Sequence, residues 1–389
     1  MALLRYKTND LFDRGSPLSP RRAANSLLNR EEGGRGEPLP RSMPRRLVLE
    51  LTNDCNLNCR MCGRRDAIFR RTYFDIEWLR RLEPILDDVE EVTLMGWGEP
   101  TLHPDFPAML RLIRRHGARI YFCTNGMNLG KLREEIFASR VDIIAISLDG
   151  STAGKNAAIR RGADFGRIMR GIAGIVEEKR RLGVAYPYMN FITTLMADNL
   201  KDFPAIVRLA GEMGLEEAKA VYLTAFSDRM LQQSLFGRQA EVEDCFARAL
   251  AEGGRLGVDV KLPAIQGGDP AGAAPHQPCR SPWRDLFVGS DGFVRPCMST
   301  PLKFFHVDDF PDFVSLWLHP ALAEFRRGVN VPDRMDAGCR LCYQSSHANW
   351  NRRESFIRVG NAFAPEWGEE GNGRSSACRP VAAAGSNPA

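Results

Sequence analysis

Six short apolar runs alternate with amphipathic segments, and this alternation constrains the fold more than any other feature of the sequence. The runs are rich in Val, Ile, Leu and Phe, as buried strands are, and cover residues 46–52, 91–96, 118–123, 141–148, 188–195 and 218–225. The segments between them have apolar side chains at helical spacing, at residues 75–86, 105–117, 129–139, 165–183 and 200–214. Gly117, Gly183 and Gly214 stand where helix ends favour a left-handed residue. The pattern predicts an α/β fold with a parallel sheet covered by helices, and doubly wound and barrel topologies both satisfy it.

Outside this region the pattern changes. Residues 1–44 are rich in Arg, Pro and Gly without sustained periodicity, so we expect a flexible N-terminal arm, and the small, polar stretch 365–389 predicts a disordered tail. From residue 257 strand-like pieces flank a Gly- and Pro-rich linker, and Ser290-Asp291-Gly292 is a hairpin turn signal. We therefore expect the six-strand unit at 45–256 and a small α+β domain at 257–364.

Composition narrows the class of protein. The 53 basic and 48 acidic residues are largely interspersed, which argues against a dedicated nucleic-acid-binding protein. No apolar run reaches about 18 residues and the N-terminus lacks the apolar core of a signal peptide, so we expect a cytoplasmic protein without a membrane partner. In a reducing cytoplasm the 10 cysteines are more typical of metal ligands or free thiols than of disulfides.

Three cysteines follow the first predicted strand with the spacing C-x3-C-x2-C: Cys55, Cys59 and Cys62. Three thiolates can hold three corners of a [4Fe–4S] cubane and leave the fourth iron open to an exogenous ligand. The motif would lie at the carboxyl end of the strand, where β/α barrels build their active sites. The alternatives are a zinc site completed by a distant residue, although zinc motifs favour two pairs of ligands, and reduced structural thiols.

A second set of cysteines consists of Cys279, Cys297, Cys339 and Cys342. Four thiolates can ligate one [4Fe–4S] cluster completely, and structural zinc in an all-cysteine site is the alternative. Cys123 ends a predicted buried strand and Cys245 lies in an amphipathic segment, so both are more typical of small core residues than of ligands. His103 is expected to be structural. The sequence does not single out a catalytic acid or base.

The triplet resembles the signature of the radical S-adenosylmethionine (radical SAM) superfamily, and further motifs follow in the order of that family across residues 46–225. "GWGEP" is similar to the family's Gly-Gly-Glu-Pro motif, with Trp97 where many members have glycine. "TNG", "SLDG" and "RRGADF" resemble the later segments that line the cofactor. The resemblance implies cofactor contacts from Gly96, Gly98, Glu99, Thr124, Asn125, Ser147, Asp149 and Arg160.

The same resemblance implies a partial (β/α)6 TIM-type barrel, which decides between the topologies that periodicity leaves open. It implies that S-adenosyl-L-methionine (SAM) binds the open iron, that Glu99 and the loop around it hold the methionyl amino group, and that Arg160 holds the carboxylate. Residues 279–342 resemble the SPASM/twitch domains that carry auxiliary iron–sulfur clusters. Because a full SPASM domain has further cysteines after the C-x2-C pair, and the stretch that follows Cys342 here has none, we expect two [4Fe–4S] clusters, one binding SAM and one auxiliary.

These features imply a radical SAM oxidoreductase that cleaves SAM to a 5′-deoxyadenosyl radical and abstracts a substrate hydrogen atom. The auxiliary cluster would accept the remaining electron, and an external reductant such as flavodoxin or ferredoxin would supply the first one. Only about 45 residues precede the first strand, too few for a typical peptide-binding domain, so we expect oxidation of a small molecule, namely a sugar, a cyclitol or a natural-product intermediate. The alternatives are crosslinking or epimerisation of a ribosomally made peptide, a mutase reaction, and a metal-stabilised binding module without catalysis.

Overall fold

A computed structural model of the chain describes residues 18–66, 70–225, 228–263, 265, 278–297, 302–336 and 339. Within these residues one 9-stranded sheet has the strand order β11-β10-β1-β3-β4-β5-β7-β8-β9. Its six central strands are β1 (Arg46–Leu49), β3 (Glu91–Leu94), β4 (Arg119–Thr124), β5 (Ile143–Ser147), β7 (Tyr188–Leu195) and β8 (Glu217–Tyr222). All six pair in parallel with their neighbours. The six predicted strands and the α/β class are therefore confirmed.

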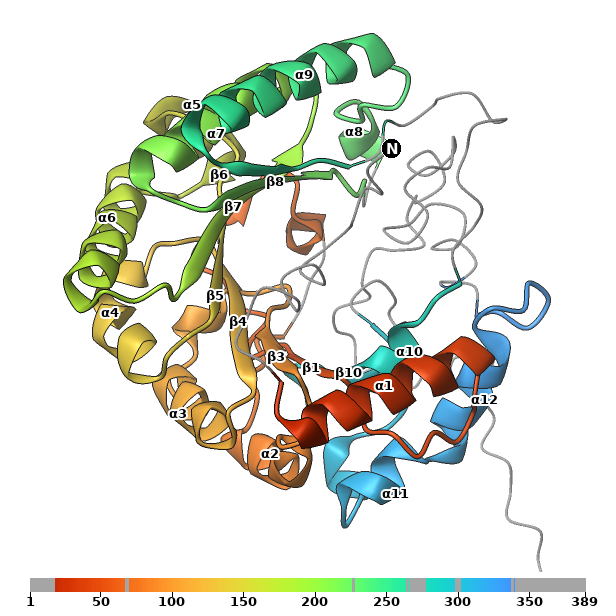
Figure 1. The fold of residues 1–389 in the computed structure, drawn as a ribbon. Helices are drawn as coiled ribbons and strands as arrows, with labels where there is room; N and C mark the ends of the chain where they lie inside the picture. The colour runs from red at the N-terminus through yellow and green to blue at the C-terminus, as the bar shows by residue number, and fades with distance from the viewer. Residues whose placement is uncertain are drawn as a thin grey trace, which may run out of the picture.

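The helices lie along the convex side of the curved sheet, as Figure 1 shows. They include α2 (Ile76–Arg81), α3 (Phe106–His116), α4 (Leu129–Ala138), α5 (Ala153–Ile159), α6 (Phe165–Leu182), α7 (Phe203–Met213) and α9 (Gln239–Leu256). A further short helix, α8 (Asp228–Leu231), precedes α9 in the chain. Gly117, Gly183 and Gly214 end α3, α6 and α7 in the left-handed conformation, with φ of 70°, 64° and 75°. The predicted helix ends are thus confirmed, and the sheet with its helices forms the expected partial barrel.

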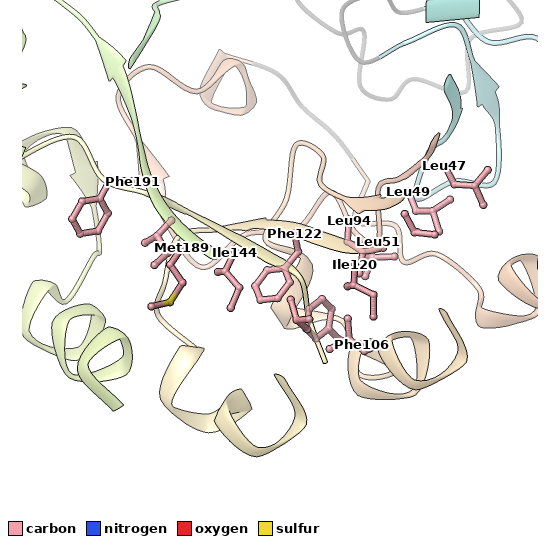
Figure 2. Close-up of a cluster of buried hydrophobic side chains, with 14 of the residues drawn as sticks. Leu47, Leu49, Leu51, Leu94, Phe106, Ile120, Phe122, Ile144, Met189 and Phe191 are labelled. Carbon is pink, nitrogen blue, oxygen red and sulfur yellow. The ribbon is translucent and has the colours of Figure 1, made fainter. Parts of the chain in front are cut away.

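The hydrophobic core lies between the sheet and these helices. Figure 2 shows side chains that alternate along the strands and point to the helical side, including Leu47 and Leu49 of β1, Ile120 and Phe122 of β4, and Phe191 of β7. Because successive side chains of a strand point to opposite faces, the intervening residues lie on the concave face. Several of these are polar and buried, and the carboxyl ends of the strands bring the predicted motifs to that face.

The C-terminal segments complete both edges of this sheet. At one edge β10 (Asp285–Val288) pairs in parallel with β1 and antiparallel with β11 (Val294–Arg295), and at the other β9 (Asp259–Lys261) pairs with β8. The turn between β10 and β11 contains Gly292 with a φ of 75°, as the hairpin signal predicts. Three short helices follow or flank it: α10 (Ser281–Arg284), α11 (Phe313–Trp317) and α12 (Pro320–Gly328). The division into two domains at residue 257 stays a prediction, although β10 belongs to the same sheet as the barrel strands.

Part of the expected flexible arm is instead a helix, α1 (Pro20–Arg35), which begins at the N-cap Ser19 and ends at the left-handed Gly36. Its buried side is polar rather than apolar, with Arg22, Ser26, Asn29 and Glu32 at helical spacing. The Asn29 side-chain amide donates to the carbonyl of Trp283 at 2.8 Å. The expectation was wrong for this segment because a polar buried face leaves no apolar periodicity to detect.

Residues 1–17 of the arm and the predicted tail at 365–389 lie outside the described residues. Among the helices that are described, none has the length and apolar character needed to cross a membrane.

Candidate functional site

The three-cysteine loop begins six residues after β1 and is fixed by a second, two-stranded sheet. Strand β2 (Asn58–Cys59) pairs antiparallel with β6 (Arg160–Arg161), which places Cys59 directly opposite Arg160. The amide of Arg60 donates to the carbonyl of Ile159 at 2.9 Å, and that of Cys62 to the carbonyl of Cys59 at 3.2 Å. The loop is therefore ordered by backbone hydrogen bonds, so little ordering would be left for ligand binding to supply.

Charge around the loop suits thiolate ligands. Burial raises the pKa of Cys55, Cys59 and Cys62, and each thiol also interacts electrostatically with at least one of the others. Arg64 opposes this rise in pKa at Cys55 and Cys62, and Arg160 opposes it at Cys59 and Cys62. Two guanidinium groups thus lie close enough to offset the negative charge that three bound thiolates bring.

The donor set fits an iron–sulfur cluster with one open corner. Among the described residues no group of three or more His, Cys, Asp or Glu side chains is arranged to hold a single metal ion. Thiolates that ligate a cubane each bind a different iron, so they need not converge on one point. Cys55, Cys59 and Cys62, which lie on one short loop and are all free thiols, supply three such ligands and leave the fourth iron for another molecule.

The Gly96–Glu99 segment after β3 packs against the backbone just before the first cysteine. A Cβ at Gly98 would overlap the carbonyl oxygens of Thr52 and Asp54, so only glycine permits this approach. The amide of Glu99 donates to the carbonyl of Asp54 at 2.8 Å. The predicted cofactor loop and the cysteine loop therefore form one unit.

The Glu99 carboxylate joins this unit to the end of β4. It is 2% exposed and accepts hydrogen bonds from the hydroxyl of Thr124 at 2.7 Å and the amide of Asn125 at 2.7 Å. Burial raises the pKa of Glu99, and these hydrogen bonds, with others from Thr101, oppose the rise. The Asn125 side chain in turn donates to Asn56 at 2.7 Å and reaches Cys55 Sγ at 3.9 Å. Glu99 thus organises the site; its contact with SAM stays a prediction.

Two further predicted cofactor contacts, Asp149 and Arg160, form an ion pair. Arg160 Nε lies 2.6 Å from Asp149 Oδ2, and both side chains are buried. The other carboxylate oxygen, Oδ1, accepts from the amide of Thr194 at 2.7 Å. Arg160 Nη1 reaches Cys59 Sγ at 3.9 Å. The pair therefore connects the ends of β5 and β7 to the middle cysteine.

Ser147, the last residue of β5, lies beside Cys123 of β4, with the hydroxyl 3.5 Å from the thiol sulfur. Cys123 faces the concave side, since its neighbour Phe122 belongs to the helix-side core. Its thiol, whose pKa burial raises, interacts electrostatically with Glu99 and Arg160. The sequence interpretation of Cys123 as a core residue misses this placement next to the site.

Cys245 and His103, the remaining residues singled out in the sequence, are buried and form hydrogen bonds with backbone groups. Cys245 is buried in α9, and its thiol donates to the carbonyl of Leu200 at 3.0 Å. His103 is 4% exposed, with Nε2 2.8 Å from the carbonyl of Phe74 and Nδ1 accepting from the amide of Asp105. Its burial lowers the pKa of His103, which favours the neutral ring. Neither residue contacts the cysteine loop in these bonds.

The second cysteine set is described in part. Cys279 precedes α10, and its backbone amide and carbonyl bind the side-chain amide of Asn330 at 2.7 and 3.0 Å. Cys297 follows β11. Cys279, Cys297 and Cys339 are each partly buried, and none of the three forms a disulfide. Cys342 lies outside the described residues. An auxiliary cluster on these four cysteines stays a prediction.

Glu50, which directly follows β1, is a site residue that sequence interpretation missed. It is 1% exposed and its carboxylate accepts from the amide of Trp97, in the middle of the cofactor loop, at 2.7 Å. The signal was present in the sequence, because Glu50 is a charged residue inside the apolar run 46–52. Buried carboxylates are uncommon unless they are paired or hydrogen-bonded.

The family model of the radical SAM superfamily matches residues 49–210 of this chain. A tungsten-containing aldehyde ferredoxin oxidoreductase cofactor-modifying protein from Pyrococcus furiosus is 26% identical over 182 residues, covering 44% of this chain and 49% of that protein. Mycofactocin maturase MftC from Mycobacterium ulcerans is 32% identical over 138 residues, covering 33% of this chain and 36% of MftC. The GTP 3′,8-cyclase of Alkaliphilus metalliredigens is 25% identical over 271 residues, covering 64% of this chain and 79% of the cyclase. The chain therefore spans half or less of the length of the first two relatives.

Solved structures share the fold. Streptococcus suis SuiB superposes with a TM-score of 0.64 at 14% identity, covering 92% of this chain and 84% of SuiB. The crystal structure of SuiB bound to the precursor peptide SuiA gives a TM-score of 0.61 at 14% identity, covering 92% of this chain and 85% of that one. At such identities the likeness establishes the architecture alone.

Proposed function

The chain carries a radical SAM domain at residues 49–210, and we propose that it is a radical SAM enzyme that modifies a peptide by abstracting a hydrogen atom from it. Enzymes of this superfamily use a [4Fe–4S] cluster and SAM, and the free thiols of Cys55, Cys59 and Cys62 suit the cluster. When bound, the two groups supply reductive cleavage of a C–S bond of SAM to methionine and a 5′-deoxyadenosyl radical.

We assign the surrounding residues to positioning SAM. Gly98 allows the loop after β3 to lie against the cysteine loop, and Glu99 holds that loop to Thr124 and Asn125. Arg160 is oriented by Asp149, so its charge can face a carboxylate beside the cysteines without first losing side-chain freedom. Ser147 is the last residue of β5, and Gly96 lies two residues after the end of β3, so both are at the carboxyl ends of these strands. These groups are largely buried, which strengthens their electrostatic interactions with a bound ligand.

The identity to a maturase supports a peptide substrate. MftC has 32% identity over the matched stretch, a higher value than the other relatives described above, and its name describes a protein that matures mycofactocin. The fold of SuiB, solved with its precursor peptide, is one that can hold a peptide. The observation that carries the proposal is the MftC identity, since the SuiB likeness bears on the fold alone.

Modification of a small molecule is the second candidate, and one observation favours it. The GTP 3′,8-cyclase relative aligns over 64% of this chain and 79% of its own length, more of both than MftC does. Oxidation of a sugar, a cyclitol or a natural-product intermediate belongs to this candidate. An oxidation in either substrate class leaves one electron for an acceptor.

We propose an auxiliary [4Fe–4S] cluster on Cys279, Cys297, Cys339 and Cys342 as that acceptor, since four thiolates leave no iron open for substrate. Three of these cysteines, Cys279, Cys297 and Cys339, are described, and none of the three forms a disulfide. An external one-electron donor, such as flavodoxin or ferredoxin, would reduce the SAM-binding cluster.

Substrate-dependent formation of 5′-deoxyadenosine tests the substrate class. The reconstituted protein, reduced with dithionite under anaerobic conditions, would be incubated separately with synthetic peptides encoded beside its gene and with GTP. We expect a peptide to raise the yield above the substrate-free background and to change mass. If GTP or another small molecule alone raises the yield, the peptide proposal is wrong and the second candidate stands.

A further inference from the structure

Glu50 lies where three segments of the site meet. It follows β1, the strand between β10 and β3, and its amide donates to the carbonyl of Val288 at 3.0 Å. On the other side of β1, the amide of Met95 donates to the carbonyl of Leu49 at 3.1 Å. The Glu50 side chain is therefore held between the ends of β10 and β3.

The two carboxylate oxygens of Glu50 bind different segments. Oε1 accepts from the amide of Trp97 at 2.7 Å, within the cofactor loop Gly96–Glu99. Oε2 accepts from the hydroxyl of Ser290 at 3.0 Å and from its amide at 3.3 Å, in the turn between β10 and β11. One buried carboxylate thus connects the cofactor loop to the C-terminal hairpin.

Glycine at position 96 makes the contact possible. A Cβ at Gly96 would lie 2.6 Å from Glu50 Oε1 and would overlap its side-chain carbons. The loop consequently rests directly on the Glu50 side chain, so a shift of that side chain displaces the loop. Because protein interiors are close-packed, such a displacement cannot be absorbed by free space.

The hairpin is tied to the cysteine loop by the same network. The hydroxyl of Ser290 donates to Glu50, so the Thr72 hydroxyl, 2.7 Å away, donates to Ser290. The Thr72 amide donates to the Asn53 side chain at 2.9 Å, two residues before the first cysteine. Along the chain, the hairpin continues through β11 to Cys297, two residues beyond its end.

We propose that Glu50 is a positioning residue that couples the Ser290 hairpin to the Gly96–Glu99 loop, so that the hairpin leading to Cys297 sets the affinity for SAM. This inference rests on the proposed function only where it concerns SAM. The mechanical coupling itself concerns the chain alone. Burial raises the pKa of Glu50, and the hydrogen bond from the Trp97 amide and the charge of Arg295 oppose that rise.

The test uses Glu50→Gln and Ser290→Ala in the full-length reconstituted protein, with Glu91→Gln as a matched control. Glu91 is also a fully buried glutamate, on the neighbouring strand β3, and the hydrogen bond that it accepts from the Thr93 hydroxyl at 2.6 Å lies within β3 and not on the cofactor loop. The first readout is hydrogen exchange in peptides that cover residues 95–100 and 288–293. The second is the dissociation constant for SAM, measured by equilibrium dialysis, with iron content determined for each variant.

We expect both Glu50→Gln and Ser290→Ala to speed exchange in both peptides by about tenfold, because loss of the hydrogen bonds opens both segments. The dissociation constant for SAM should rise by about threefold to tenfold, the effect of one lost hydrogen bond, with iron content unchanged. Glu91→Gln should change neither quantity, even if it lowers the melting temperature.

Unchanged exchange at residues 95–100 in Ser290→Ala would overturn the coupling. This variant removes one hydroxyl at a turn, so it decides the matter alone if Glu50→Gln fails to fold. Exchange that rises without any change in SAM affinity would overturn the claim that the hairpin sets affinity. Failure of the wild-type protein to bind SAM at all would instead contradict the proposed function, and the exchange data would still test the coupling.

Discussion

Arg160 Nε lies 2.6 Å from Asp149 Oδ2, and this buried ion pair lies beside the middle cysteine of the site. The resemblance implied a cofactor contact from each of these residues. The structure shows that Asp149 also holds Arg160, while the backbone pairing of β6 with β2 holds Arg160 opposite Cys59. Orientation of the arginine is therefore built into the protein before any ligand binds.

Removing one member of this pair should be strongly destabilising. Arg160→Met leaves the Asp149 carboxylate buried without its cation, and breaking a buried pair in this way costs about 3–5 kcal/mol. Arg160→Met combined with Asp149→Asn should recover part of that loss, because the unpaired charge is gone. Urea unfolding of the four proteins in a double-mutant cycle measures the coupling, and additive losses would show that the pair is not an energetic unit.

Gly98 should tolerate no side chain. In Gly98→Ala the new methyl overlaps the carbonyl oxygens of Thr52 and Asp54, which must move and displace the cysteine loop. We expect reconstituted iron to fall by about half if the auxiliary site still fills. Gly254→Ala is the matched control, since a Cβ at this helical position would have no atom within 4 Å other than its chain neighbours and the backbone of its own helix, and the change should stabilise the protein by about 1 kcal/mol or less. Full iron content in Gly98→Ala would contradict the steric argument.

A histidine far from the site gives the fold a predictable pH dependence. Partial burial works against protonation of His116, but hydrogen bonds to Glu83 at 2.9 Å and Asp87 at 3.0 Å outweigh it and raise the pKa of His116. A folded pKa above the unfolded one means that the stabilisation is complete below about pH 6.5 and is lost as pH rises through the folded value.

The free energies of unfolding of wild type and His116→Gln should therefore differ most near pH 6 and converge towards pH 9. The difference is lost as pH rises from the pKa of an unperturbed histidine through the raised pKa of His116. Denaturant titrations across that range measure the difference. A gap that widens with pH would show that the ring is neutral in the folded protein.

The auxiliary cysteines should be separable from the SAM site. Cys279→Ala and Cys297→Ala should each lower bound iron from about eight to about four atoms, while substrate-free cleavage of SAM persists. Cys245→Ala is the control, because that thiol is buried in α9 and donates to a carbonyl. If the wild-type protein binds only about four iron atoms together with zinc, the second site is a structural zinc site and the prediction is wrong.

Sequence patterns predicted the parts of the fold that depend on local periodicity. The six strands and the glycine-terminated helices were found because their apolar residues repeat at the spacing of one face. Helix α1 was missed since the stripe it buries, from Arg22 to Glu32, is polar. Its ends were nonetheless marked, by Ser19 and Pro20 at the start and Gly36 at the end.

Within the site, the C-x3-C-x2-C spacing identified the cysteine loop, and the resemblance to radical SAM motifs identified the segments that meet it. The pairings across the site could not be read in this way. Asp149 with Arg160, Glu99 with Asn125 and Glu50 with Ser290 join residues 11 to 240 positions apart, and each pairing depends on how the strands lie side by side. Side-chain geometry of this kind follows from tertiary packing, which no local pattern encodes.

Cleavage of SAM by the reconstituted protein tests the central claim most directly. Anaerobic protein reduced with dithionite would be mixed with SAM, and 5′-deoxyadenosine would be quantified by mass spectrometry, with Cys59→Ala measured in parallel. If the three cysteines hold a cluster whose open iron binds SAM, the wild type forms 5′-deoxyadenosine and Cys59→Ala forms none. Equal amounts from the two proteins, or none from an iron-loaded wild type, would contradict the account.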